Sequence, residues 1–221
     1  MSLADSFAPL LLPQPDRQEA ILDAAFAAFA TYGYRRTAMD DIARGAGLSR
    51  SALYLHYRNK EDIFRSLAAR YFESALRDMR AALDRPGQSF EEALLAALVA
   101  KDGKFMEAVL TTPHGAELLD AGFSVSGDLA TAGAAQFEAV LAAWLARRPL
   151  ADGVGSPEDV AQTIMVAVKG LKTSARSLGD YRTGQARLAR IFARALSHDA
   201  RAPLSQGVTC PTSLPEAKAG A

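Results

Sequence analysis

The chain has 221 residues, of which 49% are hydrophobic and 23% are charged, and its 25 basic residues balance its 25 acidic ones. This is an ordinary folded composition, and the length allows a small unit of about 60 residues beside a larger one. No apolar run approaches the roughly 20 residues of a membrane-spanning helix, and the single cysteine, Cys210, excludes an intrachain disulfide. We therefore expect a cytoplasmic protein without a membrane segment.

Residues 1–15 are expected to be a flexible leader, and nearly every later segment has the apolar spacing of a helix. Because no segment alternates as a strand does, the sequence predicts an all-α fold. The first helix is predicted to begin at Asp16, which has capping-box spacing to Glu19, and to end at Gly33.

Two short helices joined by a tight turn are predicted between Thr37 and Lys60. Gly47 allows the turn, and Ser49 can cap the second of these helices. One face of the first has the i, i+3, i+4, i+7 spacing of buried residues; its members are Met39, Ile42, Ala43 and Ala46. This pattern is typical of a helix-turn-helix, whose second helix commonly reads the major groove. We place this unit in residues 16–60.

A fourth helix is predicted from Asn59 to about Leu83 and would connect the small unit to a larger helical domain, residues 84–198. Helices are expected there over residues 89 to about 99, over 105–113, around 118–119, over 129–145, from 156 to about 178, and from about 184 to 197. Breaks are expected at 101–103, 122–127 and 153–155, where glycine is present in each case. Residues 199–221 have the composition of a disordered tail.

The predicted helix-turn-helix is basic although the whole chain is neutral. Between Gly33 and Lys60 there are six basic side chains and two acidic ones. They are Arg35, Arg36, Arg44, Arg50, Arg58 and Lys60, against Asp40 and Asp41. Such a local excess of positive charge fits a nucleic-acid backbone. The alternative is a solvated basic face that binds nothing.

The residues from about 16 to 72 resemble the TetR family of bacterial transcriptional repressors. The matching positions are Gly33-Tyr34, Thr37, Asp41-Ile42-Ala43, Ala46-Gly47-Leu48-Ser49, Leu53-Tyr54 and Asn59-Lys60-Glu61. The resemblance implies a homodimeric repressor that binds a palindromic operator and is released by a small-molecule effector. It also implies that residues 84–198 form a ligand-binding and dimerisation domain. Two positions, Ala38 and Leu55, depart from residues common in the family.

The DNA contacts are predicted partly from geometry and partly from the resemblance. Arg50, Ser51 and Tyr54 point broadly one way, and Arg50 has the fork that can contact guanine. The resemblance implies that Tyr54, His56 and Lys60 contact DNA phosphates. The alternatives are that Tyr54 is a core aromatic and that His56 is a plain surface group. Thr37 is expected to cap its helix and offer its hydroxyl or amide to a phosphate. The predicted DNA-binding residues are Thr37, Arg44, Ser49, Arg50, Ser51, Tyr54, His56 and Lys60.

The resemblance further implies an effector cavity, and few ionisable residues in the relevant helices favour a hydrophobic or aromatic effector. The candidate lining residues are Phe105, Met106, His114, Phe137, Leu141, Trp144 and Met165. For each of them the sequence favours plain core over ligand lining, because aromatic and methionine residues at helical spacing are what cores are made of.

The last two long helices are the candidate dimer interface, as half of a four-helix bundle. The predicted interface residues are Val160, Ile164, Val168, Leu171, Leu188, Ile191, Phe192 and Ala195. An intrachain core is the alternative for these residues.

Other classes of protein were compared with this interpretation. The sequence has no glycine-rich phosphate loop and no HExxH motif, and residues 122–127 only approach a nucleophile elbow. Three scattered histidines and one tail cysteine do not have the spacing of a zinc site, so no metal and no cofactor is expected. An enzyme is therefore disfavoured, and a ligand-blind architectural DNA-binding protein is the nearer alternative.

Overall fold

The structure is a computed structural model that describes residues 17–196, with only the backbone described at Lys104, Gly122 and Phe123. The expected leader, the Asp16 cap, the end of the last helix at 197 and the expected tail at 199–221 lie outside these residues. Within the described range every regular element is an α-helix, as predicted. None of these helices is long and apolar enough to cross a membrane.

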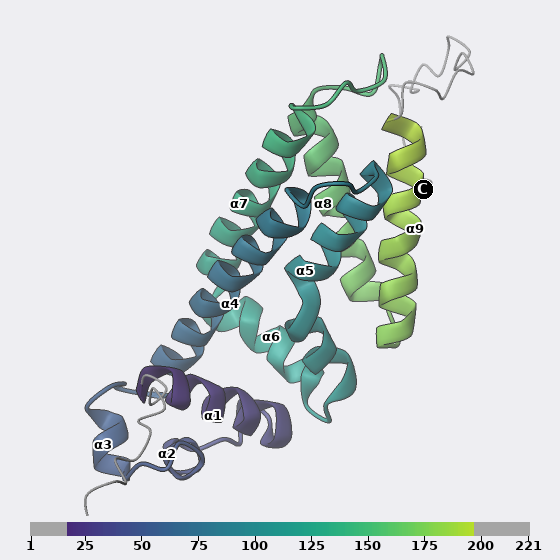
Figure 1. Ribbon diagram of the computed structural model, residues 1–221. Coiled ribbons are helices and arrows are strands. Elements are labelled where there is room, and N and C mark those ends of the chain that lie inside the picture. The colour runs from purple at the N-terminus through teal and green to yellow at the C-terminus, as the bar shows by residue number, and fades with distance from the viewer. Residues whose placement is uncertain (1–16, 197–221) are drawn as a thin grey trace, which may run out of the picture.

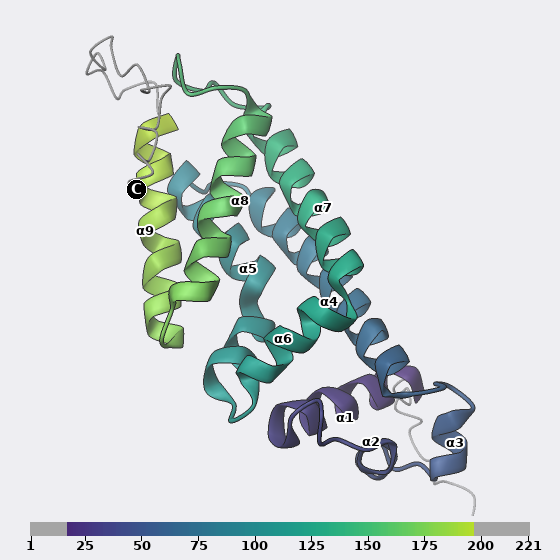
Figure 2. The ribbon, with the colours of Figure 1, turned by 180° about the vertical axis from the view of Figure 1, so that it is seen from behind.

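Nine helices follow one another in residues 17–196 (Figure 1). They are α1 (Arg17–Tyr32), α2 (Met39–Gly45), α3 (Arg50–Tyr54), α4 (Lys60–Leu83), α5 (Phe90–Thr111), α6 (Gly115–Val125), α7 (Gly127–Leu145), α8 (Pro157–Ser174) and α9 (Leu178–Leu196). Helices α1 to α3 form a small unit at one end of the molecule, and α4 runs from it into a larger bundle. Seen from behind, α8 lies beside α9 on a side of the bundle distant from α3 (Figure 2).

Several helix starts were predictable because a short polar side chain caps the N-terminus of the helix. Ser49, Asn59, Ser89 and Ser156 each accept a hydrogen bond from the backbone N–H three residues later, at 3.1, 2.7, 3.3 and 3.1 Å. Such caps satisfy N–H groups that have no partner inside the helix. Helices α2 and α7 lack such a side-chain cap. The N-cap of α7 is Ser126, whose side chain makes no capping hydrogen bond among the described residues. The N-cap of α2 is Ala38, whose N–H donates to the Asp41 carboxylate at 2.9 Å.

Two of the predicted breaks and two of the predicted helix boundaries in the larger domain are wrong. Helix α5 runs unbroken through 101–103, and α6 continues through most of 122–127 to Val125. Helix α8 ends at Ser174 rather than near 178, and α9 begins at Leu178 rather than near 184. A glycine inside a helix costs only about 1 kcal/mol, and burial of flanking side chains, such as Ala121 in α6, outweighs it.

Two separate hydrophobic cores hold the molecule together. The smaller core contains α1, α2, α3 and the first turn of α4, with Leu53 and Phe29 fully buried at its centre. Leu118 and Ala121 of α6 also belong to it. The larger core contains residues of α4, α5, α7, α8 and α9. Because α4 contributes to both cores and α6 packs on the smaller one, these two helices join the units.

Candidate nucleic-acid interface

The turn between α2 and α3 has a backbone shape that favours glycine. Gly47 has φ +68°, in the left-handed region that residues with a Cβ rarely adopt. The Leu48 N–H donates to the Ala43 carbonyl at 2.8 Å, which closes the turn against α2. Leu53 then fills the joint beside Ile42. The helix-turn-helix prediction for this segment is confirmed, and α3 is held with one face outward.

The outward face of α3 carries the predicted base-reading group. The Arg50 side chain is exposed, and its guanidinium lies 5.6 Å from the centre of the Tyr54 ring. Its Nη1 also donates to the Asp40 carboxylate at 3.1 Å. The Tyr54 side chain, and then Asp40, raise the pKa of Arg50, so the guanidinium remains charged. The hydrogen bond to Asp40 therefore orients the Arg50 side chain, which stays exposed at the surface.

The two serines next to Arg50 have different roles. Ser49 Oγ accepts the Ala52 N–H as the cap of α3, and it lies 3.0 Å from Ser51 Oγ. Ser49 is thus engaged in capping, whereas Ser51 presents a small exposed side chain. A small residue there allows close approach of α3 to a partner.

Thr37 does not have the role predicted for it, because both of its polar groups bond inside the protein. The side chain is 2% exposed. Its hydroxyl donates toward the Gly33 carbonyl at 2.7 Å and the Ala28 carbonyl at 3.3 Å, and its N–H donates to Gly33 at 3.1 Å. Neither group caps α2 or faces solvent. Thr37 instead holds the segment that follows α1 through these internal hydrogen bonds.

Lys60 also has internal partners rather than a free ammonium group. Its Nζ donates to the carbonyls of Tyr34, Arg35 and Thr37 at 2.6, 3.1 and 2.9 Å. It also lies 4.7 Å from the centre of the Tyr34 ring. Partial burial lowers the pKa of Lys60. An ammonium group has three N–H donors, so Lys60 is positioned to tie α4 to the connection before α2.

The remaining basic groups of the small unit are exposed and weakly paired. Arg44 lies 3.8 Å from Asp41, and Arg58 lies 2.8 Å from Asp62. Exposed pairs of this kind contribute only about 0–1 kcal/mol, so a phosphate can replace either carboxylate. His56 is exposed as well, which keeps it available for a backbone contact.

The aromatic and apolar residues at the end of α3 differ in their exposure to solvent. Tyr54 is exposed, whereas Tyr57 is buried in the smaller core, and its hydroxyl has no hydrogen-bond partner among residues 17–196. Leu55, noted in the sequence only as a departure, is 87% exposed beside Tyr54. An apolar side chain so exposed next to Arg50 is a candidate contact that the sequence prediction missed.

The small unit is fastened to the bundle through α6 and α4. Glu117 of α6 accepts the Arg35 N–H at 2.6 Å, and Arg65 of α4 binds Asp128 with two hydrogen bonds of 2.8 and 2.7 Å. His114 lies at this junction, 3.8 Å from Glu117. It borders an open hollow of about 370 Å³, together with residues of α1 and α2.

The predicted effector-lining residues do not come together as one group. Phe105 and Phe137 lie near a shared aromatic cluster, because Phe105 contacts Tyr71 and Phe137 contacts Phe72, with ring centres 5.1 and 6.2 Å apart. His114 is at the junction instead. The others are core or partly buried: Met106, Leu141 and Trp144 are buried, and Met165 is half-buried.

The predicted dimer residues are mostly core of a single chain. Val160, Ile164 and Val168 are buried in the larger core, which corrects their assignment to an interface. Leu171, Leu188 and Phe192 are half-buried, whereas Ile191 and Ala195 are exposed. The exposed apolar residue of α8 is Val166, on the face opposite to Ile164 and Val168.

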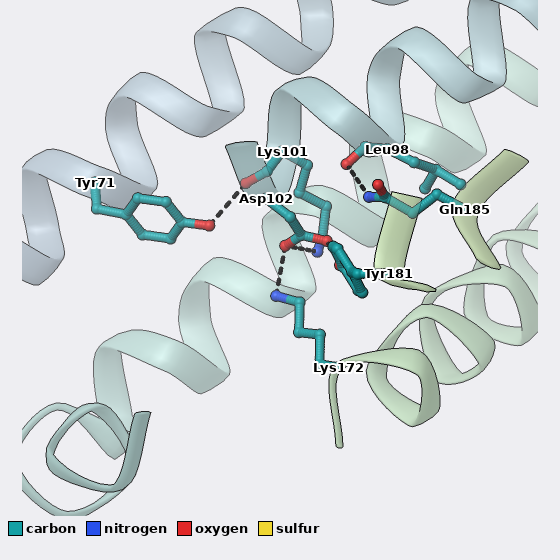
Figure 3. A network of polar contacts seen from close by, with 7 residues as sticks. All are labelled: Tyr71, Leu98, Lys101, Asp102, Lys172, Tyr181 and Gln185. Carbon is teal, nitrogen blue, oxygen red and sulfur yellow. Dashed lines mark hydrogen bonds and ion pairs between the residues drawn. The ribbon is translucent and has the colours of Figure 1, made fainter. Parts of the chain in front are cut away.

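Sequence reasoning also missed a buried polar cluster around Lys101 and Asp102 of α5 (Figure 3). A signal was present, because Leu94, Leu98 and Asp102 are spaced by four residues and so share a helix face. The neighbouring Gly103 was interpreted as a break, which placed the charged pair in a loop.

The geometry of residues 17–60 defines a helix-turn-helix protein with an exposed third helix. A family model for bacterial regulatory proteins of the tetR family matches residues 21–67. This match covers the helix-turn-helix unit, and residues 21–67 of the chain are therefore similar to the N-terminal unit of tetR-family regulators.

Two curated relatives resemble the same part of the chain. The uncharacterized HTH-type transcriptional regulator YhgD of Bacillus subtilis is 33% identical over 88 residues, which are 38% of this chain and 44% of YhgD. The HTH-type transcriptional repressor BepR of Brucella suis is 34% identical over 87 residues, which are 38% of this chain and 42% of BepR. The chain thus spans less than half the length of these relatives.

The whole fold resembles solved structures at low sequence identity. SmeT, the repressor of the Stenotrophomonas maltophilia multidrug efflux pump SmeDEF, superposes with a TM-score of 0.63 at 20% identity over 90% of this chain and 97% of SmeT. A transcriptional regulator from Cytophaga hutchinsonii superposes with a TM-score of 0.65 at 17% identity over 80% of this chain and 97% of that protein. These likenesses concern the fold.

Proposed function

We propose that this protein is a sequence-specific DNA-binding transcriptional regulator that acts as a homodimer and releases its operator when a small effector binds. The observation that carries the proposal is the outward face of α3, where Arg50 is exposed and held by Asp40. The similarity to the repressor BepR supports repression as the mode of action.

The DNA-bound form would place α3 in the major groove. Arg50 would exchange Asp40 for a guanine edge, where its fork can make two hydrogen bonds. Tyr54, His56 and Arg44, which are all exposed, would hold phosphates and so fix the register of α3. Each of these contacts uses a group that is exposed at the surface of the free protein.

A dimer would double the short stretch that one α3 can read, because five residues contact few base pairs. The proposed interface consists of the outward faces of α8 and α9. Val166 is 65% exposed there and Ile191 of α9 is also exposed. A Cβ added at Gly170, one turn after Val166, would meet nothing within 4 Å. Nothing in the described residues therefore requires glycine at this position, which suits the close approach of a second copy.

Effector control would act through the helices that join the two units. A ligand that binds one arrangement of the larger bundle better shifts the population toward it. Movement of α4 or α6 would then change the position of α3 and the separation of the two reading helices in the dimer. The Arg35–Glu117 and Arg65–Asp128 contacts would transmit this movement.

A ligand-blind DNA-binding protein is the second candidate. One observation favours it: two open hollows among the described residues lie against α1 and outside the larger core. Release of bound DNA by a small molecule would distinguish the regulated protein from this alternative.

The proposed function is tested by selecting bound duplexes from a random DNA library with the full-length protein. We expect enrichment of a palindrome whose half-sites are about one helical turn apart. Salt-sensitive binding without an enriched motif would support the ligand-blind alternative in an architectural role. Absence of binding by a folded dimer would contradict both.

A further inference from the structure

A cluster of charged and polar side chains lies inside the larger bundle, where α5, α8 and α9 meet (Figure 3). Asp102 is at its centre and is 1% exposed. Its Oδ1 accepts a hydrogen bond from Lys101 Nζ at 2.8 Å and lies 2.5 Å from Lys172 Nζ. Its Oδ2 accepts a hydrogen bond from the Tyr181 hydroxyl. Both carboxylate oxygens are therefore fully engaged.

The charges in this cluster do not balance. Lys101 and Lys172 bring two ammonium groups, and Asp102 is the one carboxylate that pairs with either of them among residues 17–196. Tyr71 and Gln185 add no charge, because a phenol and an amide are neutral; they donate to the backbone carbonyls of Lys101 and Leu98. One positive charge is left over in the part of the bundle that the structure describes.

Burial makes this imbalance costly. Lys101 is 4% exposed. Burial, and then repulsion from Lys172, lowers the pKa of Lys101 to about 8. Burial alone would raise the pKa of Asp102, but the two ammonium groups together lower it. A buried charge without a partner is strongly unfavourable, so a second anion beside the two lysines would relieve it.

A group of aromatic rings lies beside Lys101. Lys101 Nζ lies 5.1 Å from the centre of the Phe137 ring, and Phe137 contacts Phe72. Phe72 and Phe105 both lie against Tyr71, with ring centres 5.3 and 5.1 Å away. A ligand whose charged end meets Lys101 therefore has aromatic surface for the rest of its body.

The cluster is reachable from solvent on the side of α8. The Lys172 side chain is 23% exposed, in the last turn of α8. The short connection 175–177 that follows leads into α9, which carries Tyr181. An incoming anion would therefore meet Lys172 first and Lys101 second.

We propose that this cluster binds a small organic carboxylate with an apolar body, which joins Asp102 as a second acidic partner of Lys172 and Lys101. This inference rests on the proposed function in one respect, because such a carboxylate would be the effector. The cluster connects α5 to α8 and α9, and α5 leads directly into α6, which packs on the smaller core. Binding at Lys101 would thus move the helix that contacts the DNA-reading unit.

The test is isothermal titration calorimetry on the full-length protein without DNA. The probes are benzoate and octanoate, each compared with its uncharged amide, benzamide and octanamide. We expect at least one carboxylate to bind and its amide to bind at least about tenfold more weakly, because charged hydrogen bonds are the stronger ones. The two carboxylates also distinguish an aromatic body from an aliphatic one.

Two variants should move the affinity in opposite directions. Lys172→Met should weaken carboxylate binding at least about tenfold. The matched control is Lys169→Met, on the same helix with an exposed side chain, which should leave it unchanged. Asp102→Asn should tighten binding, because it removes the acidic group that shares the two lysines. A merely structural cluster would not give this opposite response.

The proposal is overturned if neither carboxylate binds at millimolar concentration, if each amide binds as well as its acid, or if Lys172→Met binds like the wild type. Should Asp102→Asn fail to fold, Lys172→Met decides, because its partly exposed position tolerates a methionine. These outcomes do not depend on DNA, so they are separate from failure of the operator selection. A carboxylate that binds without releasing operator DNA would keep the site and remove its regulatory role.

Discussion

The two units of this protein use charged side chains in opposite ways. In the small unit, Arg44, Arg50 and Arg58 are exposed, and each is paired with a nearby surface carboxylate. In the larger unit, Lys101 and Asp102 are almost completely buried. Surface pairs exchange partners at little cost, whereas buried charges are costly to leave without one. The small unit is therefore suited to meet an external polyanion, and the bundle to respond to a small molecule that enters it.

The first way to test this comparison is to remove one buried carboxylate and one exposed carboxylate and to compare the losses of stability. Asp102→Ala should lower the free energy of unfolding by about 3–5 kcal/mol, because it leaves two lysines without their buried partner. Asp128→Ala, which breaks the exposed pair with Arg65, should cost less than about 1 kcal/mol. Urea unfolding of both variants measures the difference. Equal losses would show that the cluster is not energetically distinct from a surface pair.

The second prediction concerns the outward face of α8. Gly170→Arg should abolish dimerisation and weaken operator binding about a hundredfold or more, because a charged side chain would enter the interface core. Gly103→Arg is the matched control, since a Cβ there also meets nothing within 4 Å. Sedimentation equilibrium and gel-shift titration measure both effects. A dimeric Gly170→Arg protein would move the interface elsewhere.

The third prediction separates structure from phosphate binding at Lys60. Lys60→Met should destabilise the small unit by about 1–3 kcal/mol, because three carbonyls lose a charged donor. The salt dependence of DNA binding should stay unchanged, whereas loss of a phosphate contact would reduce its slope by about one. Arg58→Met should alter stability by less than about 1 kcal/mol, as expected for an exposed pair. A reduced slope for Lys60→Met would restore the phosphate assignment.

The smallest expected effect concerns Leu55. If its exposed side chain meets a thymine methyl group, Leu55→Ser should weaken operator binding by less than about 1 kcal/mol. Replacing operator thymines with deoxyuridine, which lacks the methyl group, should weaken the wild type but not the variant. An equal response of both proteins to deoxyuridine would exclude this contact.

The small unit was predictable because its signals are local. Helix caps such as Ser49 and Asn59, and the turn at Gly47, each act within three or four residues. Lys60 was misjudged because its carbonyl partners lie 23 to 26 residues earlier in the chain. Thr37 was misjudged because its hydroxyl turns back to the Gly33 and Ala28 carbonyls instead of facing solvent. A polar side chain next to a basic turn has the same local signal whether it faces solvent or the protein.

The larger unit was less predictable because its decisive contacts join distant helices. Asp102 and Tyr181 are 79 residues apart, and no local sequence pattern predicts their hydrogen bond. Along α8, the residues at 160, 164 and 168 had correct helical periodicity but were assigned to the wrong partner. Periodicity identifies an apolar face, but it does not say whether this chain or a second copy covers that face.

The most direct test of the DNA-reading role of α3 is the affinity of wild type and Arg50→Ala for the selected operator and for a scrambled duplex of equal length. A base-reading Arg50 predicts a loss of about 1–3 kcal/mol on the operator and little change on the scrambled duplex. Equal weakening on both duplexes would contradict base reading and would assign Arg50 to the phosphate backbone.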